Sequence, residues 1–338
     1  MSAIARFPIL LGDIGGTFAR FAIIAEPEQP FQLLAKDRTS AHRDPTSAIL
    51  SAMASYSGAK PVCALLAVAG RVTGPVAHLT NAGWTIDSRK IGRELGLKEV
   101  MLLNDYSAAA AGLSTLAETS GSGVTQIGAQ LKGLGPQVIL GPGTGLGAAA
   151  LIPFASRLVI QSTEAGHIEF GAITDDELHL WPMIERERGR MTAETLLSGP
   201  GLVRLYRALA LARKVHHRID TPSEIVDSGL SGKDPLTTET LHLFCRLLGR
   251  FAGDLALVFG AIGGVFLAGG VALRMAAILA KSDFRAAFER KSPFESVMRE
   301  TPTFLITHPE PVLVGLSTLA AQPRHFLLRA GRWRSRST

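Results

Sequence analysis

Two short glycine-rich turns, each set between apolar runs, constrain this sequence more than any other feature. The first is GDIGGTFAR at residues 12–20, which separates the apolar runs FPILL and FAII. The second is LGPGTGLGAAA, which begins at Leu140 near the middle of the chain. Apolar runs of strand length on both sides of a short glycine turn are typical of β-hairpins. We therefore predict that a glycine-turn hairpin opens each half of the chain.

A glycine turn of this kind is suited to binding phosphate. Consecutive backbone N–H groups in a tight turn give a phosphate several donors, and glycine leaves no side chain in the way. Asp13 adds a negative charge beside the first turn, and this charge would repel a phosphate unless a cation were also bound. We therefore predict that Asp13 holds Mg²⁺ through water. Each turn alone could be only a hairpin corner. Together they predict a nucleotide tail held from both sides by Gly15, Gly16, Thr17, Gly143, Thr144 and Gly145.

The rest of the chain alternates strand-like and helix-like segments. VCALLAVAG at 62–70 predicts a buried strand, and 175–194 is predicted to be helical. Neither glycine turn is a Walker A loop, and Leu146 stands where the dinucleotide fingerprint requires its last glycine, which disfavours a Rossmann dehydrogenase. The alternation predicts an α/β fold, and 338 residues suit two domains.

The net charge of +6 is concentrated near one end of the sequence. The last fifteen residues hold five arginines and no acid, and removing those five charges from +6 leaves +1. We therefore expect a basic, solvated tail rather than a nucleic-acid-binding face. We find no signal peptide and no membrane span, because the most apolar stretches are interrupted by glycines. Cys63 and Cys245 lie in apolar sequence and are predicted to be buried free thiols.

Several motifs together resemble one enzyme family. LLGDIGGTFARFAI, LTNAGWTI, LLNDYSAAA, GPGTGLG, EAGHIEF, TAETLLSGPGLVRLYRAL and FGAIGGVFLAGGVALR occur in the order and spacing of bacterial ATP-dependent glucokinases. The resemblance runs from about Leu10 to Ala320. It implies a two-domain hexokinase/actin-like (ribonuclease-H-like) fold with a cleft between the domains, in the branch that lacks a cysteine-rich zinc motif. The domains expected are 1–112 with 308–325, 113–307, and a tail at 326–338.

The resemblance assigns a role to Asp105, which follows an apolar strand in LLNDY. On the residues alone, Asp105 is better interpreted as the N-cap of a helix beginning near Ser107. The resemblance instead makes it the general base that accepts the proton of the sugar 6-hydroxyl. It also implies glucose and ATP as substrates, glucose 6-phosphate and ADP as products, Mg²⁺ as cofactor, and a cytoplasmic homodimer that binds neither nucleic acid nor membrane.

Other residues are assigned to ligands in the same way. The sugar contacts implied by the resemblance, besides Asp105, are Asn81, Asn104, Glu164, His167 and Glu194. Without it, Glu164 and His167 would be surface residues, since no third ligand close by supports a metal site. Gly269 and Gly270 in LAGG would let the backbone approach the adenosine end, although the same residues also suit a strand-to-helix turn.

Three residues depart from the family pattern. Phe18 replaces the usual asparagine, Arg71 stands where proline is frequent, and Val312 stands where glycine is common. Phe18 and Arg71 could change sugar selectivity, so a kinase of mannose, fructose or an amino sugar remains an alternative. A sugar-sensing regulator on the same fold is disfavoured, because Asp105 is retained and no helix-turn-helix precedes Ile9.

Overall fold

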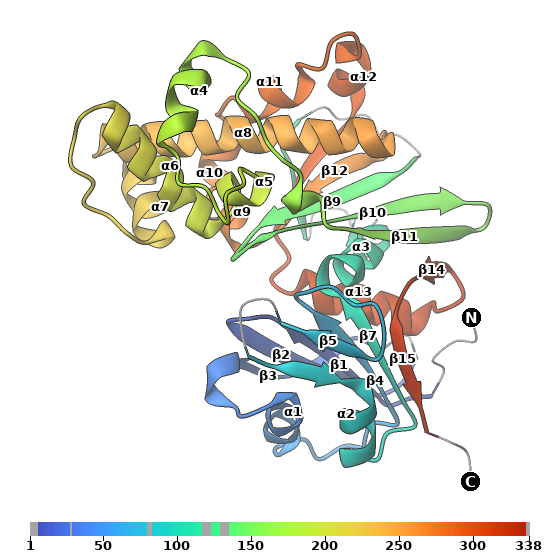
Figure 1. Cartoon of the computed structure of the whole chain (residues 1–338). Coiled ribbons are helices and arrows are strands. Elements are labelled where there is room, and N and C mark those ends of the chain that lie inside the picture. Colours follow the sequence, from blue (N-terminus) through green and yellow to red (C-terminus); the bar gives the residue numbers. More distant parts are fainter. Residues whose placement is uncertain (1–5, 28, 80–82, 117–122, 129–134, 336–338) are drawn as a thin grey trace. The chain divides into compact units, whose positions relative to one another are not determined.

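The computed structural model describes residues 6–27, 29–79, 83–116, 123–128 and 135–335. The chain forms two compact α/β units (Figure 1). The first unit comprises residues 1–122, 149–162 and 308–338, and the second comprises 123–148 and 163–307. The α/β class is as predicted. The division differs from the expected one in that residues 113–122 and 149–162 group with the first unit.

The first unit is built on a six-stranded sheet. Its strands, in spatial order, are β15 (Gly331–Arg334), β7 (Glu99–Asn104), β4 (Cys63–Val68), β1 (Ile9–Ile14), β2 (Phe18–Ile24) and β3 (Gln32–Arg38). β1 pairs antiparallel with β2 and parallel with β4, which confirms the first predicted hairpin. Every residue of β1 and β4 is buried, as their unbroken apolar sequences predict for strands covered on both faces.

Helices and short strands complete the first unit. They are η1 (Thr39–Ala41), α1 (Pro45–Met53), β5 (Val76–His78), β6 (Thr85–Asp87), α2 (Ser88–Glu94), α3 (Asp105–Leu116), β11 (Arg157–Thr163), α13 (Pro311–Ala321) and β14 (Phe326–Leu328). Only the last residue of β11, Thr163, belongs to the second unit.

Helices α3 and α13 touch backbone to backbone. A Cβ added to Gly315 would lie 1.7 Å from the carbonyl oxygen of Ala108, and one added to Gly112 would lie 3.1 Å from the nitrogen of Gly315. One turn further along, the hydroxyls of Thr115 and Thr318 are 3.0 Å apart. The contacts advance along both helices in the same direction, so α3 and α13 run parallel and begin at the same end of the pair.

The prediction of a solvated basic tail is wrong for residues 326–335. β14 pairs in parallel with β11, and β15 pairs antiparallel with β7. Phe326 is buried, and the ring of Trp333 covers Gly92 of α2. The arginines on either side of Trp333, Arg332 and Arg334, both pair with the carboxylate of Glu99. The alternation Arg-Trp-Arg is typical of a strand with one polar and one apolar face, because successive side chains of a strand point to opposite sides. A count of charges does not reveal this alternation.

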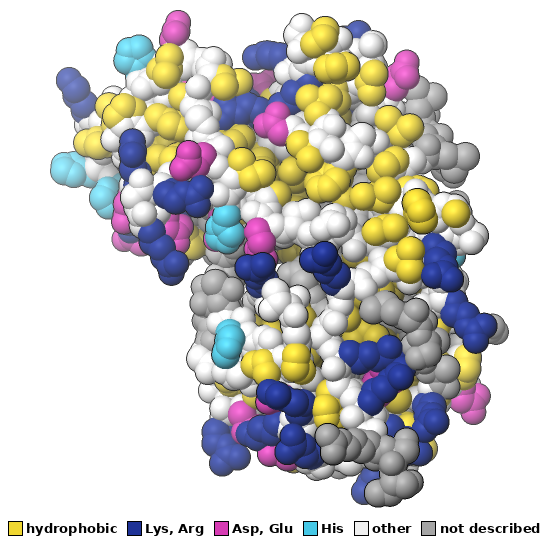
Figure 2. All heavy atoms as spheres, turned by 45° about the vertical axis from the view of Figure 1, so that its right-hand side comes forward, with side chains coloured by type: hydrophobic (Ala, Val, Ile, Leu, Met, Phe, Trp, Pro, Cys, Tyr) yellow, Lys and Arg dark blue, Asp and Glu magenta, His cyan; other side chains and the backbone are white. Residues whose placement is uncertain are grey.

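The basic excess is therefore a property of a folded surface. The first unit has 17 Lys and Arg against 11 Asp and Glu, a difference of +6, whereas the second unit has 18 of each. Figure 2 shows many Lys and Arg side chains on the face of the first unit that it presents. No helix in the described part of the chain has the length and apolar character needed to cross a membrane.

The second unit contains the other glycine hairpin. Its strands follow the order β10 (Leu146–Phe154), β9 (Gln137–Pro142), β12 (Gly264–Leu267), β13 (Thr303–Ile306) and β8 (Val124–Gln126), with β10 passing into the first unit from residue 149. β12 pairs in parallel with β9 and β13. β9 and β10 are neighbours joined by the GPGTG turn, which confirms the second predicted hairpin.

Helices make up most of the rest of the second unit, with the long α8 prominent among them (Figure 1). They are η2 (Ala165–His167), α4 (Asp175–Leu180), η3 (Trp181–Met183), α5 (Ala193–Leu196), α6 (Gly199–Ala212), α7 (Pro222–Ser231), α8 (Pro235–Phe259), α9 (Gly270–Arg274), α10 (Ala276–Leu279), α11 (Phe284–Glu289) and α12 (Glu295–Glu300).

The predicted helix over 175–194 is wrong in its second half. Regular helix ends at Leu180, and between the end of η3 and the start of α5 the chain forms neither a regular helix nor a strand. Pro182 lacks the N–H that a continuing helix would need. Further on, Arg188 and Gly189 adopt left-handed φ values of 50° and 78°, which reverse the chain in a turn.

Candidate active site

The first glycine turn is held in place mainly through its carbonyl groups. The hydroxyl of Thr39 donates to the oxygen of Gly15 at 2.8 Å, and the nitrogen of Thr39 donates to the oxygen of Thr17 at 3.0 Å. Within the turn, the Gly15 nitrogen donates to the Phe18 oxygen at 2.9 Å. Thr17 is exposed. Anchoring by carbonyl oxygens suits a turn whose remaining N–H groups serve a ligand.

Asp13 lies at the end of β1, immediately before this turn, and its carboxylate is buried. Arg20, its partner on β2, donates from Nη1 to Oδ2 of Asp13 at 2.9 Å, and Nε of Arg20 lies 2.8 Å from Oε2 of Glu310. Burial raises the pKa of Asp13, because one guanidinium shared with Glu310 does not offset the loss of hydration. A further cation close to this carboxylate would stabilise its ionised form. Asp13 therefore fits the role of holding a cation.

Replacing Asp13 with asparagine is expected to stabilise the fold at neutral pH and to impair catalysis. The pKa of the Asp13 carboxyl is raised in the folded state, so the folded protein is more stable when this carboxyl is protonated. This contribution to stability is present at low pH and is lost as the pH rises through the folded-state pKa. Asp13→Asn should therefore raise Tm at pH 8 more than at pH 5. Activity should fall roughly 10- to 100-fold, the usual effect of losing an outer-shell ligand.

Thermal unfolding at the two pH values, together with steady-state kinetics, measures both effects. Asp37→Asn is the matched control, because the Asp37 side chain is 41% exposed and its carboxylate lies 3.2 Å from His42 Nε2, away from Asp13. A lower Tm for Asp13→Asn at pH 8 would contradict the account, since it would mean that the pair with Arg20 is stabilising as a whole.

The structure separates the roles of Asn104 and Asp105 at the junction of β7 and α3. The Asn104 Oδ1 accepts a hydrogen bond from the nitrogen of Ser107 at 3.1 Å, and its Nδ2 donates to the oxygen of Gly70 at 3.2 Å. Asn104 is thus the helix cap, and the interpretation of Asp105 as the cap is wrong. Asp105 is the first residue of α3, is half-buried, and accepts from the nitrogen of Tyr106 at 2.9 Å.

Tyr106 shows that Asp105 and Asp13 share a neighbourhood in the first unit. Burial, followed by the charges of Asp105 and Asp13, raises the pKa of the Tyr106 phenol well above its usual range. Glu310 precedes α13, which begins at the same end of the helix pair as α3. The first unit therefore gathers the proposed base, the acid beside the phosphate turn and Arg20 near one end of its sheet.

The second glycine turn is tied at two points to the TAETLLSGPG motif of its unit. The Gly143 nitrogen donates to the Gly145 oxygen at 2.8 Å, and the Gly199 nitrogen donates to the Gly143 oxygen at 2.8 Å. The Leu146 nitrogen donates to Oε2 of Glu194 at 2.7 Å. A Cβ on Gly145 would lie 2.5 Å from that same oxygen, and Gly145 has no left-handed φ. A Cβ at position 145 would displace the Glu194 carboxylate, a reason for glycine that the sequence did not reveal.

The sugar-side candidates of the second unit lie around η2 and α5. Glu164 and His167 stand at the two ends of η2 with exposed side chains, and the His167 nitrogen donates to the Glu164 oxygen at 3.0 Å. Glu194, in the first turn of α5, is half-buried. A Cβ on Gly166 would lie 2.3 Å from the Leu146 oxygen, so η2 packs directly on the glycine turn. Asn81 lies outside the described residues.

Gly269 and Gly270 form the predicted turn between β12 and α9. Gly269 has a φ of 88°, and a Cβ there would lie 2.5 Å from the oxygen of Pro142. Both constraints require glycine at 269. The strand-to-helix interpretation is confirmed, and contact of these residues with a nucleotide stays a prediction.

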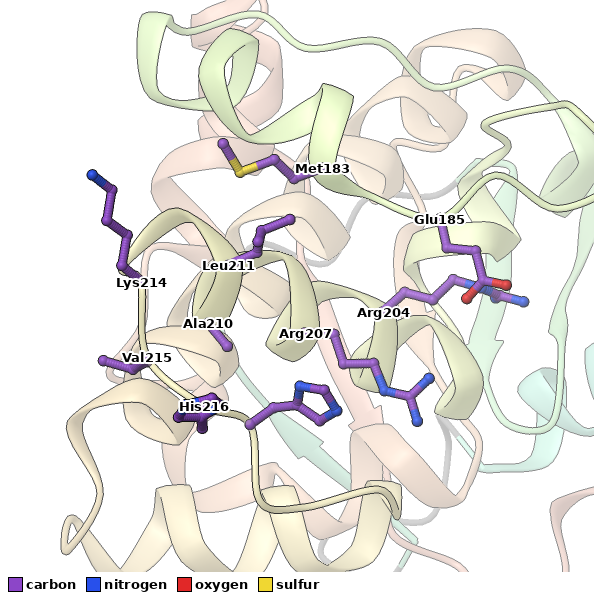
Figure 3. Close-up of a pocket in the computed structure, with 10 residues that line it drawn as sticks. Met183, Glu185, Arg204, Arg207, Ala210, Leu211, Lys214, Val215 and His216 are labelled. Atoms are coloured by element: carbon purple, nitrogen blue, oxygen red, sulfur yellow. The ribbon is translucent and has the colours of Figure 1, made fainter.

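The candidate site residues do not line the cavity of about 470 Å³ found in the second unit. This cavity is lined by residues that include Arg204, Arg207 and Leu211 of α6 and Met183 of η3 (Figure 3). The described residues also hold no group of three or more His, Cys, Asp or Glu side chains placed to bind a metal.

The three departures from the family pattern lie in the first unit. The ring of Phe18 lies beneath two cations of β3, with Cζ of Arg38 5.4 Å and Nζ of Lys36 6.0 Å from its centroid. Arg71 is exposed after β4, and Val312 lies in the first turn of α13. None of the three displaces Asp105 from the start of its helix.

Comparison with known proteins gives one consistent family. The family model described as Glucokinase matches residues 10–323, which include every candidate site residue. Glucokinase of Brucella suis is 41% identical over 338 residues, covering 98% of this chain and 96% of that protein. Glucokinase of Sinorhizobium fredii is 40% identical over 332 residues, covering 97% of each chain.

Solved structures agree. The crystal structure of glucokinase from an Antarctic psychrotroph is 31% identical, with a TM-score of 0.79 over 93% of this chain and 99% of that one. A ROK family glucokinase from Streptomyces griseus, in complex with glucose and AMPPNP, shares the fold at 21% identity, with a TM-score of 0.66 over 94% of this chain and 100% of that one. The hexokinase/actin-like fold is thereby established, and the chain belongs to the glucokinase family.

Proposed function

We propose that this chain transfers the γ-phosphoryl group of ATP to the 6-hydroxyl of D-glucose, giving glucose 6-phosphate and ADP. The observation that carries the proposal is the match of the glucokinase family over residues 10–323. Family membership makes the chain an ATP-dependent glucose kinase. The roles proposed for individual residues come from the family resemblance, and the geometry within each unit supports them.

Asp105 is the proposed general base. As the 6-hydroxyl oxygen forms its bond to the γ-phosphorus, its proton passes to the Asp105 carboxylate, and the bond from the γ-phosphorus to the bridging oxygen breaks to release ADP. Asp105 is suited to this step because Asn104 caps the helix in its place. The phenol of the neighbouring Tyr106 stays protonated, because burial raises its pKa well above the usual range.

The two glycine turns are proposed to hold the phosphates of ATP. Gly15, Gly16 and Thr17 serve in the first turn, and Gly143, Thr144 and Gly145 in the second. Mg²⁺, when bound, would neutralise charge on the phosphates, and Asp13 would hold it through water. Asp13 suits this because burial raises its pKa, and a bound cation would favour the ionised form of the buried carboxylate. Gly269 and Gly270 would let the backbone approach the adenosine end.

Besides Asp105 and Asn81, which lies outside the described residues, four polar side chains are proposed to bind the sugar. Glu164 and His167 project into solvent from a short turn with a firmly packed base. Asn104 has one amide proton and one lone pair left after capping α3 and bonding to Gly70. Glu194 keeps Oε1 for a hydroxyl while Oε2 accepts from Leu146.

We also propose that the protein acts as a cytoplasmic homodimer, on the strength of the family resemblance. Cys63 and Cys245 are buried free thiols, as a reducing compartment would leave them. Sedimentation of the purified protein tests the dimer directly.

A coupled assay of ADP release across hexoses tests the substrate. We expect glucose to give the highest kcat/KM, because the family relatives are glucokinases. Mannose, fructose and glucosamine are the competing substrates, and an assay without sugar measures background hydrolysis. A clearly higher kcat/KM for a competitor would favour the alternative kinase, and ADP release no faster than background with every hexose would contradict the enzyme assignment.

A further inference from the structure

In the second unit, the phosphate turn and the sugar-side motifs share direct contacts. Three backbone atoms near the tip of the turn meet two motifs, one of them at both Glu194 and Gly199 and the other at Gly166. The Leu146 nitrogen donates to Glu194 at 2.7 Å, and the Leu146 oxygen lies against Gly166 between Glu164 and His167. The Gly143 oxygen accepts from the Gly199 nitrogen at 2.8 Å. The turn therefore cannot shift without moving residues proposed to bind sugar.

Of these three contacts, the one from Leu146 to Glu194 is made by an ionisable side chain. Glu194 is also a proposed sugar ligand. Its helix is rigidly supported, because Thr192 caps α5 in a reciprocal arrangement with Thr195 and both threonines are buried. The Ala193 nitrogen donates to the Ile168 oxygen at 2.9 Å, which ties α5 to the residue after His167. A carboxylate on such a support has few positions available to it.

We propose that Glu194 is a positioning residue through which bound glucose sets the geometry of the second phosphate turn. This rests on the proposed function. A sugar hydroxyl that donates to Oε1 restricts the rotation of the carboxylate, and Oε2 then fixes the Leu146 N–H and the adjoining Gly145. We expect the adjoining Gly145 to follow, because a Cβ built on it would lie 2.5 Å from the same Glu194 oxygen, which places the glycine backbone directly beside this carboxylate.

The consequence is positive cooperativity between the two substrates. A turn that glucose has already ordered loses less conformational freedom when phosphate binds, so ATP binds more tightly. The effect is reciprocal, since ATP must strengthen glucose binding by the same factor. The coupling requires the hydrogen bond from Leu146 to Glu194, whereas a sugar ligand without a hydrogen bond to the turn should contribute affinity alone.

Calorimetric titration with MgAMPPNP, in the absence and the presence of saturating glucose, measures the coupling in the whole protein. For the unaltered chain we expect the Kd of the analogue to fall by roughly 5- to 100-fold when glucose is present. In Glu194→Ala, the two Kd values should become nearly equal, even when glucose is raised well above its weakened Kd. Glu194→Gln keeps an oxygen that can accept from Leu146, so it should recover part of the ratio.

Glu164→Gln is the matched control, because Glu164 is a proposed sugar ligand whose side chain makes no hydrogen bond to the turn among the described residues. It should weaken glucose binding and keep the ratio of the unaltered chain. A full ratio in Glu194→Ala, an equal loss in Glu164→Gln, or no coupling in the unaltered chain would each overturn the proposal. Failure of the unaltered protein to phosphorylate glucose would instead overturn the proposed function. Should Glu194→Ala fail to fold, the comparison rests on Glu194→Gln, whose ratio must then fall below that of Glu164→Gln.

Discussion

Asp105→Asn is expected to lower kcat by roughly 10²- to 10⁴-fold, the range measured for loss of a positioned general base. Asparagine keeps the shape of the side chain and can still accept from the Tyr106 nitrogen, but it cannot take the proton of the sugar hydroxyl. The KM for glucose should change far less than kcat, because the substitution removes a contribution made in the transition state. Steady-state kinetics with both substrates measures the two parameters.

Asn104→Ala separates catalysis from helix capping. It removes the bond to the Ser107 nitrogen, so the free energy of unfolding should fall by about 0.5–2 kcal/mol. Asp105→Asn should leave Tm nearly unchanged, because Asp105 is not the cap. If Asp105→Asn kept near-native kcat, or lost stability as Asn104→Ala does, Asp105 would be a structural residue of α3 and not the base.

Removal of residues 326–338 is expected to destabilise the first unit severely. The deletion takes away β14 and β15, and with them the buried Phe326 and the packing of Trp333 on α2. Loss of one large aromatic side chain typically costs about 3–5 kcal/mol, which is a large share of the stability of an ordinary domain. The truncated protein should aggregate or unfold at a much lower temperature, as seen by solubility and thermal unfolding.

Deletion of residues 336–338 alone is the matched control, since it spares both strands and still removes Arg336. Trp333→Ala isolates one packing contact and should give an intermediate Tm. A 326–338 deletion with unchanged Tm and kcat would show that the two strands contribute nothing to the fold of the first unit.

Features set by neighbouring residues could be predicted from the sequence. Both hairpins and the buried strand β4 follow from apolar runs and glycine turns, which are local patterns. The strand-to-helix junction near Asp105 follows from the sequence, but the identity of the residue that caps this helix does not. Asn and Asp cap helices about equally well, and a tertiary contact from Asn104 to Gly70, 34 positions earlier, decides between them.

Features that join distant parts of the chain could not be predicted. The contact from Leu146 to Glu194 spans 48 positions, and nothing in either motif encodes it. Arg332 and Glu99 are 233 positions apart, so a window near the end of the sequence shows only unpaired arginines. In both cases the sequence shows one member of the contact, a glycine turn or an arginine. Its partner can be identified only from the folded structure.

The pairing of β15 with β7 has a consequence for synthesis on the ribosome. At roughly 5–20 residues per second, the 233 positions between Glu99 and Arg332 take on the order of 10–50 seconds to translate. Throughout that interval β7, which leads into Asp105, has an unpaired edge, and such edges recruit other chains. We therefore expect the nascent first unit to be prone to aggregation through this edge while the second unit emerges.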